Sequence, residues 1–355
     1  MTEPTEQTDT RFTPGSMTPA SVSRSTARAD RVAVGFAMLV AAVLAVVLGF
    51  PTVPLGEIGA GGWEGRVFLQ LQLPRVLLGL AAGWGLGLAG AWMQGLMRNP
   101  LADPYILGVS GGAAIGSAFG FMLPVGAGLA AAVVGPLAGF LGAMSAFALV
   151  LAFGRGGGQS PLRMLLAGVV VNALAGAALM ILTTLSDAAS AQRTLVRLMG
   201  AVGVDPARPW LAPIVVTTVV TAAALLLRPS QRALDLLALG DETARTLGVD
   251  PLKLRQRALG LVSIVVGAVV AATGLIGFVG LVIPHAVRLR VGPGHARLVP
   301  LSAATAAIAV VLADATVSRL AGHLGSELPV GVATAALGGP LFLWLLARHL
   351  RGVAA

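Results

Sequence analysis

The feature that most constrains this chain is a series of long apolar runs separated by short polar stretches. The first covers residues 32–50, and comparable runs recur toward the C-terminus. The hydrocarbon core of a bilayer is about 30 Å thick, so a helix that crosses it needs about 20 apolar residues. Of the residues, 56% are hydrophobic and 11% charged, against about 25% charged in a soluble domain. The sequence therefore predicts an all-α integral membrane protein.

Ten membrane helices are predicted from these runs. They cover residues 32–50, 75–97, 105–123, 127–153, 162–186, 210–227, 258–275, 277–290, 298–319 and 328–347. An even number of crossings places both termini on one side. With the N-terminus in the cytoplasm, 18 of the 24 basic residues fall on the cytoplasmic side, in agreement with the positive-inside rule. We expect a multi-pass protein of the cell (cytoplasmic) membrane with both termini in the cytoplasm.

The domain organisation is simple. Residues 1–30 are rich in Thr, Ser, Pro and Arg and are predicted to form a disordered cytoplasmic tail. Residues 31–350 are predicted to form a single membrane domain, surrounded by lipid.

The charge and the residue types exclude two classes of function. The net charge of +9 is attributed to cytoplasmic loops and not to nucleic-acid binding. With no cysteine and no HExxH pair, no metal site is expected.

A ridge of small residues runs along the second predicted helix. Gly79, Gly83, Gly87, Ala91 and Gly95 recur every four residues, so they share one face of the helix. Small side chains let two backbones approach closely, which is how helices associate inside lipid. We expect this face to pack against another membrane helix, without a ligand.

The segment 229–257, between the sixth and seventh predicted helices, is longer than a simple connection requires. Asp241 is predicted to be the N-cap of a short helix with Glu242 in its first turn. Gly248 suits the C′ position, and Pro251 follows it. An amphipathic turn at 233–239 precedes this helix. A capped helix outside the membrane is typical of an element held in the groove of a partner protein.

Ser110 suggests a different class of function. Residues 108–112, GVSGG, fit the G-x-S-x-G pattern of serine hydrolases, and GVSG is similar to the motif of intramembrane serine proteases. A nucleophilic serine needs a base within hydrogen-bond reach, and His285 is the histidine that is expected to face the interior. In the alternative, Ser110 packs closely and hydrogen-bonds a helix carbonyl.

Asp314 suggests a further class. It lies in the ninth predicted helix, and an acid inside a membrane is a functional candidate by default. It would carry protons in an ion-coupled secondary transporter. In the alternative, Asp314 pairs with Arg319, five residues further on, and has a structural role.

Several motifs, in order and over residues 70–350, resemble the permeases of ABC importers for iron-siderophores, haem and cobalamin, the FecCD family. They are LPR at 73–75, GAWMQGLMRNPLADPYILGVSGGAAIG at 90–116, LALGDETARTLGVD at 237–250, GLIGFVGLVIPHAVRL at 274–289, VLADATVSR at 311–319 and ELPVGVATAALGGPLFLWLL at 327–346. The family also has the ten-helix frame predicted above, with both termini in the cytoplasm.

The resemblance implies a homodimer with a pore on its two-fold axis, two ABC ATPase subunits on the cytoplasmic side and a substrate-binding protein outside. The chain lacks the G-x-x-x-x-G-K-[ST] pattern of a P-loop. ATP is therefore expected to be used by a partner subunit, with no cofactor bound to this chain and no enzyme activity of its own. Iron-siderophore is the first expected cargo, followed by haem and cobalamin.

The resemblance also assigns roles to residues. The ATPase-coupling residues are Leu239, Gly240, Asp241, Glu242, Ala244, Arg245, Leu247 and Gly248. Arg75 and Arg319 are expected to meet acidic residues of the binding protein. Gln72 stands where the family commonly has arginine, so either Arg66 or Arg197 compensates for it or docking is weaker. Asn172 is the pore-lining candidate, and it either contacts the substrate or hydrogen-bonds across the dimer.

Overall fold

The structure is a computed structural model that describes residues 67–123, 129–154, 161–324 and 328–353. All regular secondary structure within these ranges is helical. Six helices in them are long and apolar enough to cross a membrane, and shorter apolar helices lie at Val109–Met122 and Val330–Trp344. The predicted all-α membrane fold is confirmed.

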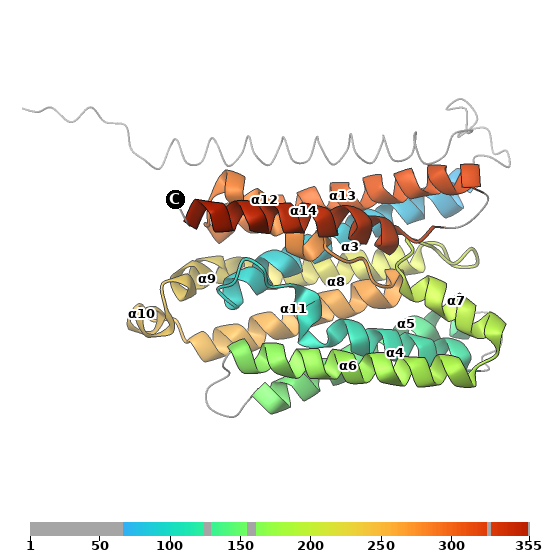
Figure 1. Ribbon diagram of the computed structural model, residues 1–355, viewed down its shortest axis with the longest axis horizontal. Coiled ribbons are helices and arrows are strands. Elements are labelled where there is room, and N and C mark those ends of the chain that lie inside the picture. The colour runs from blue at the N-terminus through green and yellow to red at the C-terminus, as the bar shows by residue number, and fades with distance from the viewer. Residues whose placement is uncertain (1–66, 124–128, 155–160, 325–327, 354–355) are drawn as a thin grey trace, which may run out of the picture.

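The helices lie roughly along one direction and form a bundle (Figure 1). In chain order they are η1 (Phe68–Gln72), α3 (Leu73–Leu96), η2 (Pro104–Leu107), α4 (Val109–Met122), α5 (Leu129–Gly154), α6 (Pro161–Leu185), α7 (Ala188–Leu198), α8 (Leu211–Leu227), η3 (Arg228–Ser230), α9 (Gln231–Ala238), α10 (Asp241–Thr246), α11 (Pro251–Thr273), α12 (Val279–Val291), α13 (His295–Leu324) and α14 (Val330–Val353). Helices α9 and α10 lie at one end of the bundle, here called the α10 end, and α7 lies at the other, the α7 end (Figure 1).

Nine of the ten predicted membrane helices fall on described residues, and each coincides with a helix. The predicted helix at 32–50 and the predicted tail at 1–30 lie outside the described residues. The predicted division between the seventh and eighth helices is confirmed, because α11 ends at Gly274, where φ is +69°. Two predicted starts differ. Gly108, with φ of +76°, delays α4 to Val109, and the capping side chain of Asp250 starts α11 at Pro251.

The apolar-run criterion misses α7. Its sequence, AASAQRTLVRL, alternates polar and apolar residues at helical spacing, so it does not resemble a membrane span. Helix α7 connects to the core through backbone hydrogen bonds just beyond its C-terminus. The N–H of Leu275 donates to the Leu198 carbonyl at 3.1 Å, and that of Ala201 donates to the Thr273 carbonyl at 2.8 Å.

The small-residue ridge of α3 packs against α13, as predicted. A Cβ atom added at Gly83 would lie 2.4 Å from the carbonyl oxygen of Ala306, and one added at Gly87 would lie 2.4 Å from that of Ser302. Real Cβ atoms do not approach backbone oxygens this closely, so the two helices touch backbone to backbone. Helix α3 is almost entirely buried and packs against α8, α11, α12 and α13, so it is the central element of the bundle.

Two irregular segments meet inside the bundle, next to α3. Tyr105, in η2, donates a hydrogen bond from its hydroxyl to the Ile276 carbonyl at 3.2 Å, in the segment that joins α11 to α12. Gly280, at the start of α12, lies against Gly90 of α3. Irregular backbone is tolerated at membrane depth only where it is buried in protein. Helices α4 and α12 therefore begin part-way along the bundle, and both are shorter than a full span.

Candidate functional site

The α10 end carries the predicted partner-binding helix. Helix α10 has six residues, and Gly248 follows it with φ of +84°. The N–H of Gly248 donates to the Arg245 carbonyl at 3.0 Å, and the N–H of Val249 donates to the Ala244 carbonyl at 2.9 Å. This pair of bonds is a Schellman motif, so the predicted glycine cap is confirmed.

The start of α10 differs from the prediction. Gly240 occupies the N-cap position and Asp241 is the first helical residue, so Asp241 is not the capping residue. Its carboxylate instead binds two arginines. Arg255 donates from both terminal nitrogens, to Oδ2 at 2.6 Å and to Oδ1 at 2.8 Å. Arg98 donates to Oδ1 at 2.7 Å. The hydrogen bonds with Arg255 lower the pKa of the Asp241 carboxyl.

These contacts fasten α10 to two long helices. Arg255 lies in the first turns of α11, and its side chain is buried. Arg98 lies just beyond the end of α3, with a left-handed φ of +50°. The sequence predicts neither role, because it indicates only that basic residues gather on the cytoplasmic side. One carboxylate therefore links α10 to the end of α3 and to the start of α11.

The outer surface of α9 and α10 is available to a partner. Among the predicted coupling residues, Ala244 is buried and holds α10 to the bundle, while Gly240 and Asp241 are partly exposed. Leu239, Glu242, Arg245, Leu247 and Gly248 are exposed. Two exposed leucines beside charges of both signs are typical of a surface that is covered by another protein. The coupling roles remain predictions.

Helix α9 has its own connection to the core. Asp235 accepts hydrogen bonds from the backbone N–H of His295 at 3.0 Å and pairs with Nδ1 of the same residue at 2.6 Å. His295 is the first residue of α13, the helix that packs on the ridge of α3. Helix α9 is thus hydrogen-bonded to α13, and α10 is hydrogen-bonded to α11 and to the residue just beyond α3.

At the α7 end, Arg75 and Asp314 form an ion pair. Arg75 donates from Nε to Oδ2 at 2.8 Å and from a terminal nitrogen to Oδ1 at 2.7 Å, and it also donates to Ser318 at 2.8 Å. The pairing of Asp314 with Arg319 is therefore wrong. Five residues on a helix correspond to a rotation of about 140°, so these two side chains leave α13 on different faces.

The predicted docking residues have different environments. Arg319 is exposed, whereas Arg75 is partly buried by its pairing with Asp314. Arg66 lies outside the described residues. Gln72 is buried, so the side chain at this position does not face a docking partner. The docking roles of Arg75, Arg319 and Arg66 remain predictions.

Asn172 and Ser110 form one hydrogen-bonded cluster where α6 meets the start of α4. The Asn172 side chain accepts from the backbone N–H of Gly111 at 3.1 Å and donates to the Tyr105 carbonyl at 3.1 Å. The Ser110 hydroxyl lies 3.3 Å from the same carbonyl and 3.4 Å from the Asn172 oxygen. No histidine is among these partners of Ser110, so its contacts are those of a packing residue. The pore-lining role of Asn172 remains a prediction.

Comparisons with known proteins agree with the helical membrane fold. The FecCD transport family matches residues 37–348. The hemin transport system permease HmuU of Yersinia pestis is 38% identical over 285 residues, which cover 80% of this chain and 84% of HmuU. The cobalamin import permease BtuC of Halobacterium salinarum is 39% identical over 278 residues, covering 78% and 72%. An inward-facing metal-chelate-type ABC transporter has a similar structure, with a TM-score of 0.78 and 28% identity over 90% of this chain and 99% of that one.

Proposed function

This chain belongs to the FecCD transport family and is a permease component of an ABC importer; on that premise, we propose that it imports a metal chelate as a homodimer. The relatives named above are described as permeases for hemin and for cobalamin, and a third, from Escherichia coli, as a permease for Fe(3+) dicitrate. All three cargos are chelated metals. We propose an iron-siderophore as the cargo, with haem and cobalamin as the other candidates.

The observation that carries the mechanism is the attachment of α10 to α3 and α11 through Asp241. We propose that two ATPase subunits, one for each copy of the homodimer, bind the exposed surface of α9 and α10 from the cytoplasm. Closure of the ATPase pair on ATP would then move α10, and the hydrogen bonds of Asp241 with Arg98 and Arg255 would carry the movement into the membrane helices. ATP is consumed by the partner subunits, and this chain needs no cofactor.

In this proposal the α10 end and both chain termini face the cytoplasm, and the α7 end faces a substrate-binding protein. Arg319 is exposed there and suits charge-assisted pairing with acidic residues of that protein. The described surface of α6, the helix proposed to line the pore, is dominated by apolar and small side chains. Such a wall has few groups that distinguish one chelate from another, so selectivity would reside mostly in the binding protein.

The experiment that tests the proposal begins with gentle purification from native membranes and mass spectrometry of the retained proteins. A P-loop ATPase in equal amount is expected, and recovery of this chain alone would contradict the proposal.

A second experiment tests the coupling role of α10. In proteoliposomes containing that ATPase, Glu242→Arg is expected to abolish chelate uptake and ATPase stimulation, because it reverses a charge on the exposed face. Gln256→Arg, on the exposed surface of α11, is the control. Full uptake by the Glu242→Arg variant would disprove the coupling role.

A further inference from the structure

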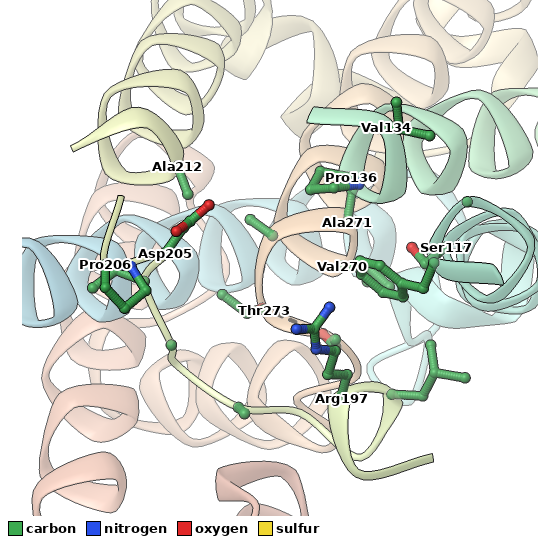
Figure 2. A pocket seen from close by; sticks show the side chains of 18 of the residues that line it. Ser117, Val134, Pro136, Arg197, Asp205, Pro206, Ala212, Val270, Ala271 and Thr273 are labelled. Carbon is green, nitrogen blue, oxygen red and sulfur yellow. Dashed lines mark hydrogen bonds between the residues drawn. The ribbon is translucent and has the colours of Figure 1, made fainter. Parts of the chain in front are cut away.

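A cavity of about 540 Å³ lies near the α7 end, between α4, α5, α7, α8 and α11. It is separate from the Arg75–Asp314 pair and from the α9–α10 segment. Apolar side chains form much of its lining, among them Val134 and Pro136 of α5 and Val270 of α11. Figure 2 shows that Arg197, Asp205 and Ser117 reach this space from different sides. The cavity is therefore amphiphilic, with charged groups of both signs.

Arg197, near the end of α7, is the cation of the cavity. Its guanidinium lies over the ring of Phe121, 4.6 Å from the ring centre. Within the described part of the chain it forms no ion pair. An arginine that rests on an aromatic ring keeps its planar edge of donors available, and that edge matches the geometry of a phosphate group.

Asp205 is the anion of the cavity. One of its carboxylate oxygens, Oδ1, accepts the backbone N–H of Ala207 at 2.8 Å, and this bond fixes the side chain within its loop. The other oxygen accepts no hydrogen bond from described residues. Asp205 and Arg197 do not pair with each other, although both line the same cavity (Figure 2). A ligand that carries a negative and a positive group would complement them both.

Ser117 of α4 contributes a hydroxyl to the lining of the cavity. The residue is 3% exposed and lines the cavity, and its hydroxyl points inward in Figure 2. Among the described residues it has no hydrogen-bond partner. Its oxygen lies against the backbone of Gly139 of α5, and an oxygen-rich group bound in the cavity would give the hydroxyl an acceptor.

Apolar side chains next to the cavity are exposed. Leu137 of α5 follows the lining residue Pro136, and Val215 of α8 lies three positions after the lining residue Ala212, close to it on the helix surface; they are 50% and 48% exposed. Both belong to helices that are apolar enough to span a membrane. Acyl chains attached to a headgroup in the cavity would therefore lie on apolar surface.

We propose that this cavity binds the headgroup of a zwitterionic phospholipid that carries a primary ammonium, as phosphatidylethanolamine does. The phosphate binds Arg197 and accepts the Ser117 hydroxyl, and the ammonium donates to the free oxygen of Asp205. Phosphatidylcholine has a quaternary ammonium without N–H donors, and phosphatidylglycerol has no cation for Asp205. The site requires only that the chain lies in a bilayer, and so it does not depend on the identity of the transported chelate.

Native mass spectrometry of the purified, delipidated full-length chain tests the proposal, with phosphatidylethanolamine, phosphatidylcholine and phosphatidylglycerol added separately. Wild type is expected to bind one phosphatidylethanolamine per chain in preference to the other two. Arg197→Gln is expected to weaken its binding about tenfold, the order of effect of losing a charge-assisted hydrogen bond. Asp205→Asn is expected to abolish the preference over phosphatidylcholine while phosphate binding remains.

Arg208→Gln is the matched control, because Arg208 is exposed in the same loop and does not line the cavity; it is expected to bind lipid as wild type does. Equal lipid binding by the Arg197→Gln and Arg208→Gln variants would overturn the proposal, as would equal binding of all three lipids by wild type. Soluble glycerophosphoethanolamine is tested in parallel. If it bound as tightly as the lipid, the occupant would be a soluble phosphate compound and the lipid assignment would be wrong.

Discussion

Asp241 is a residue whose role depends on its ionised state. Its lowered pKa arises chiefly from the hydrogen bond with Arg255. A carboxyl whose folded-state pKa is depressed adds stability above its unfolded pKa, about 3.9, and that stability is lost as the pH falls through the folded-state pKa. The interaction is thus fully present at neutral pH.

The corresponding prediction concerns the pH dependence of Asp241→Asn. Its loss of Tm relative to wild type is expected to be constant near neutral pH and to start shrinking below about pH 4, where the unfolded chain takes up a proton at Asp241 before the folded protein does; the difference is lost once the pH has fallen through the lowered folded-state pKa. Thermal unfolding in detergent at several pH values measures this difference. Glu242→Gln, at an exposed neighbouring site, is the control. A Tm difference that does not change with pH would show that the charge of Asp241 is unimportant for stability.

Arg75 and Asp314 are expected to stabilise the α7 end as a pair. Replacing either one leaves the other partly buried without its counter-charge, so Arg75→Met and Asp314→Leu are each expected to cost about 2 kcal/mol. The double variant is expected to cost less than the sum, since no lone charge remains. Unfolding free energies of the four proteins give the coupling energy. Additive losses would mean that the pair contributes no interaction of its own.

At the scale of elements, the contact of α3 with α13 has no room for additional atoms. Gly83→Ala and Gly87→Ala are each expected to destabilise the chain by about 1–3 kcal/mol, because the new methyl group meets backbone. Gly260→Ala on α11 is the matched control, since a Cβ there meets nothing within 4 Å, and alanine favours the helix. Thermal stability of the purified chains measures the effect. Equal tolerance at all three positions would contradict the close packing.

The sequence predicts elements better than it predicts their connections. Length and hydropathy are local properties, so the sequence correctly predicts the nine membrane helices that fall on described residues and the capped helix before Gly248. The partner of Asp314 is Arg75, 239 positions away, and only the three-dimensional arrangement of the helices brings them together. Asp241 has the residue type of an N-cap, but two arginines compete for its carboxylate. Helix α7 was missed because an amphipathic helix has no long apolar run.

At the scale of the whole molecule, α6 is expected to face a second copy. In its most apolar window only 11% of the residues are buried, so most of its surface is available. The chain has no native cysteine, and a single introduced cysteine is therefore a clean probe. Ala177→Cys on α6 is expected to form a cross-linked dimer on oxidation in membranes. Ile214→Cys on the exposed face of α8 is expected not to, and equal cross-linking at both positions would argue against an α6 interface.

The short length of α12 has a consequence for how the protein is made. Its 13 residues extend about 20 Å, less than the roughly 30 Å that an independently inserted segment must cross. We therefore expect that α12 does not span the bilayer by itself when it is synthesised. Its start rests against Gly90 of α3, and α13, which it also touches, is synthesised only afterwards. We therefore expect the biogenesis of this permease to include a late step, in which α12 packs between α3, which is synthesised before it, and α13, which is synthesised after it.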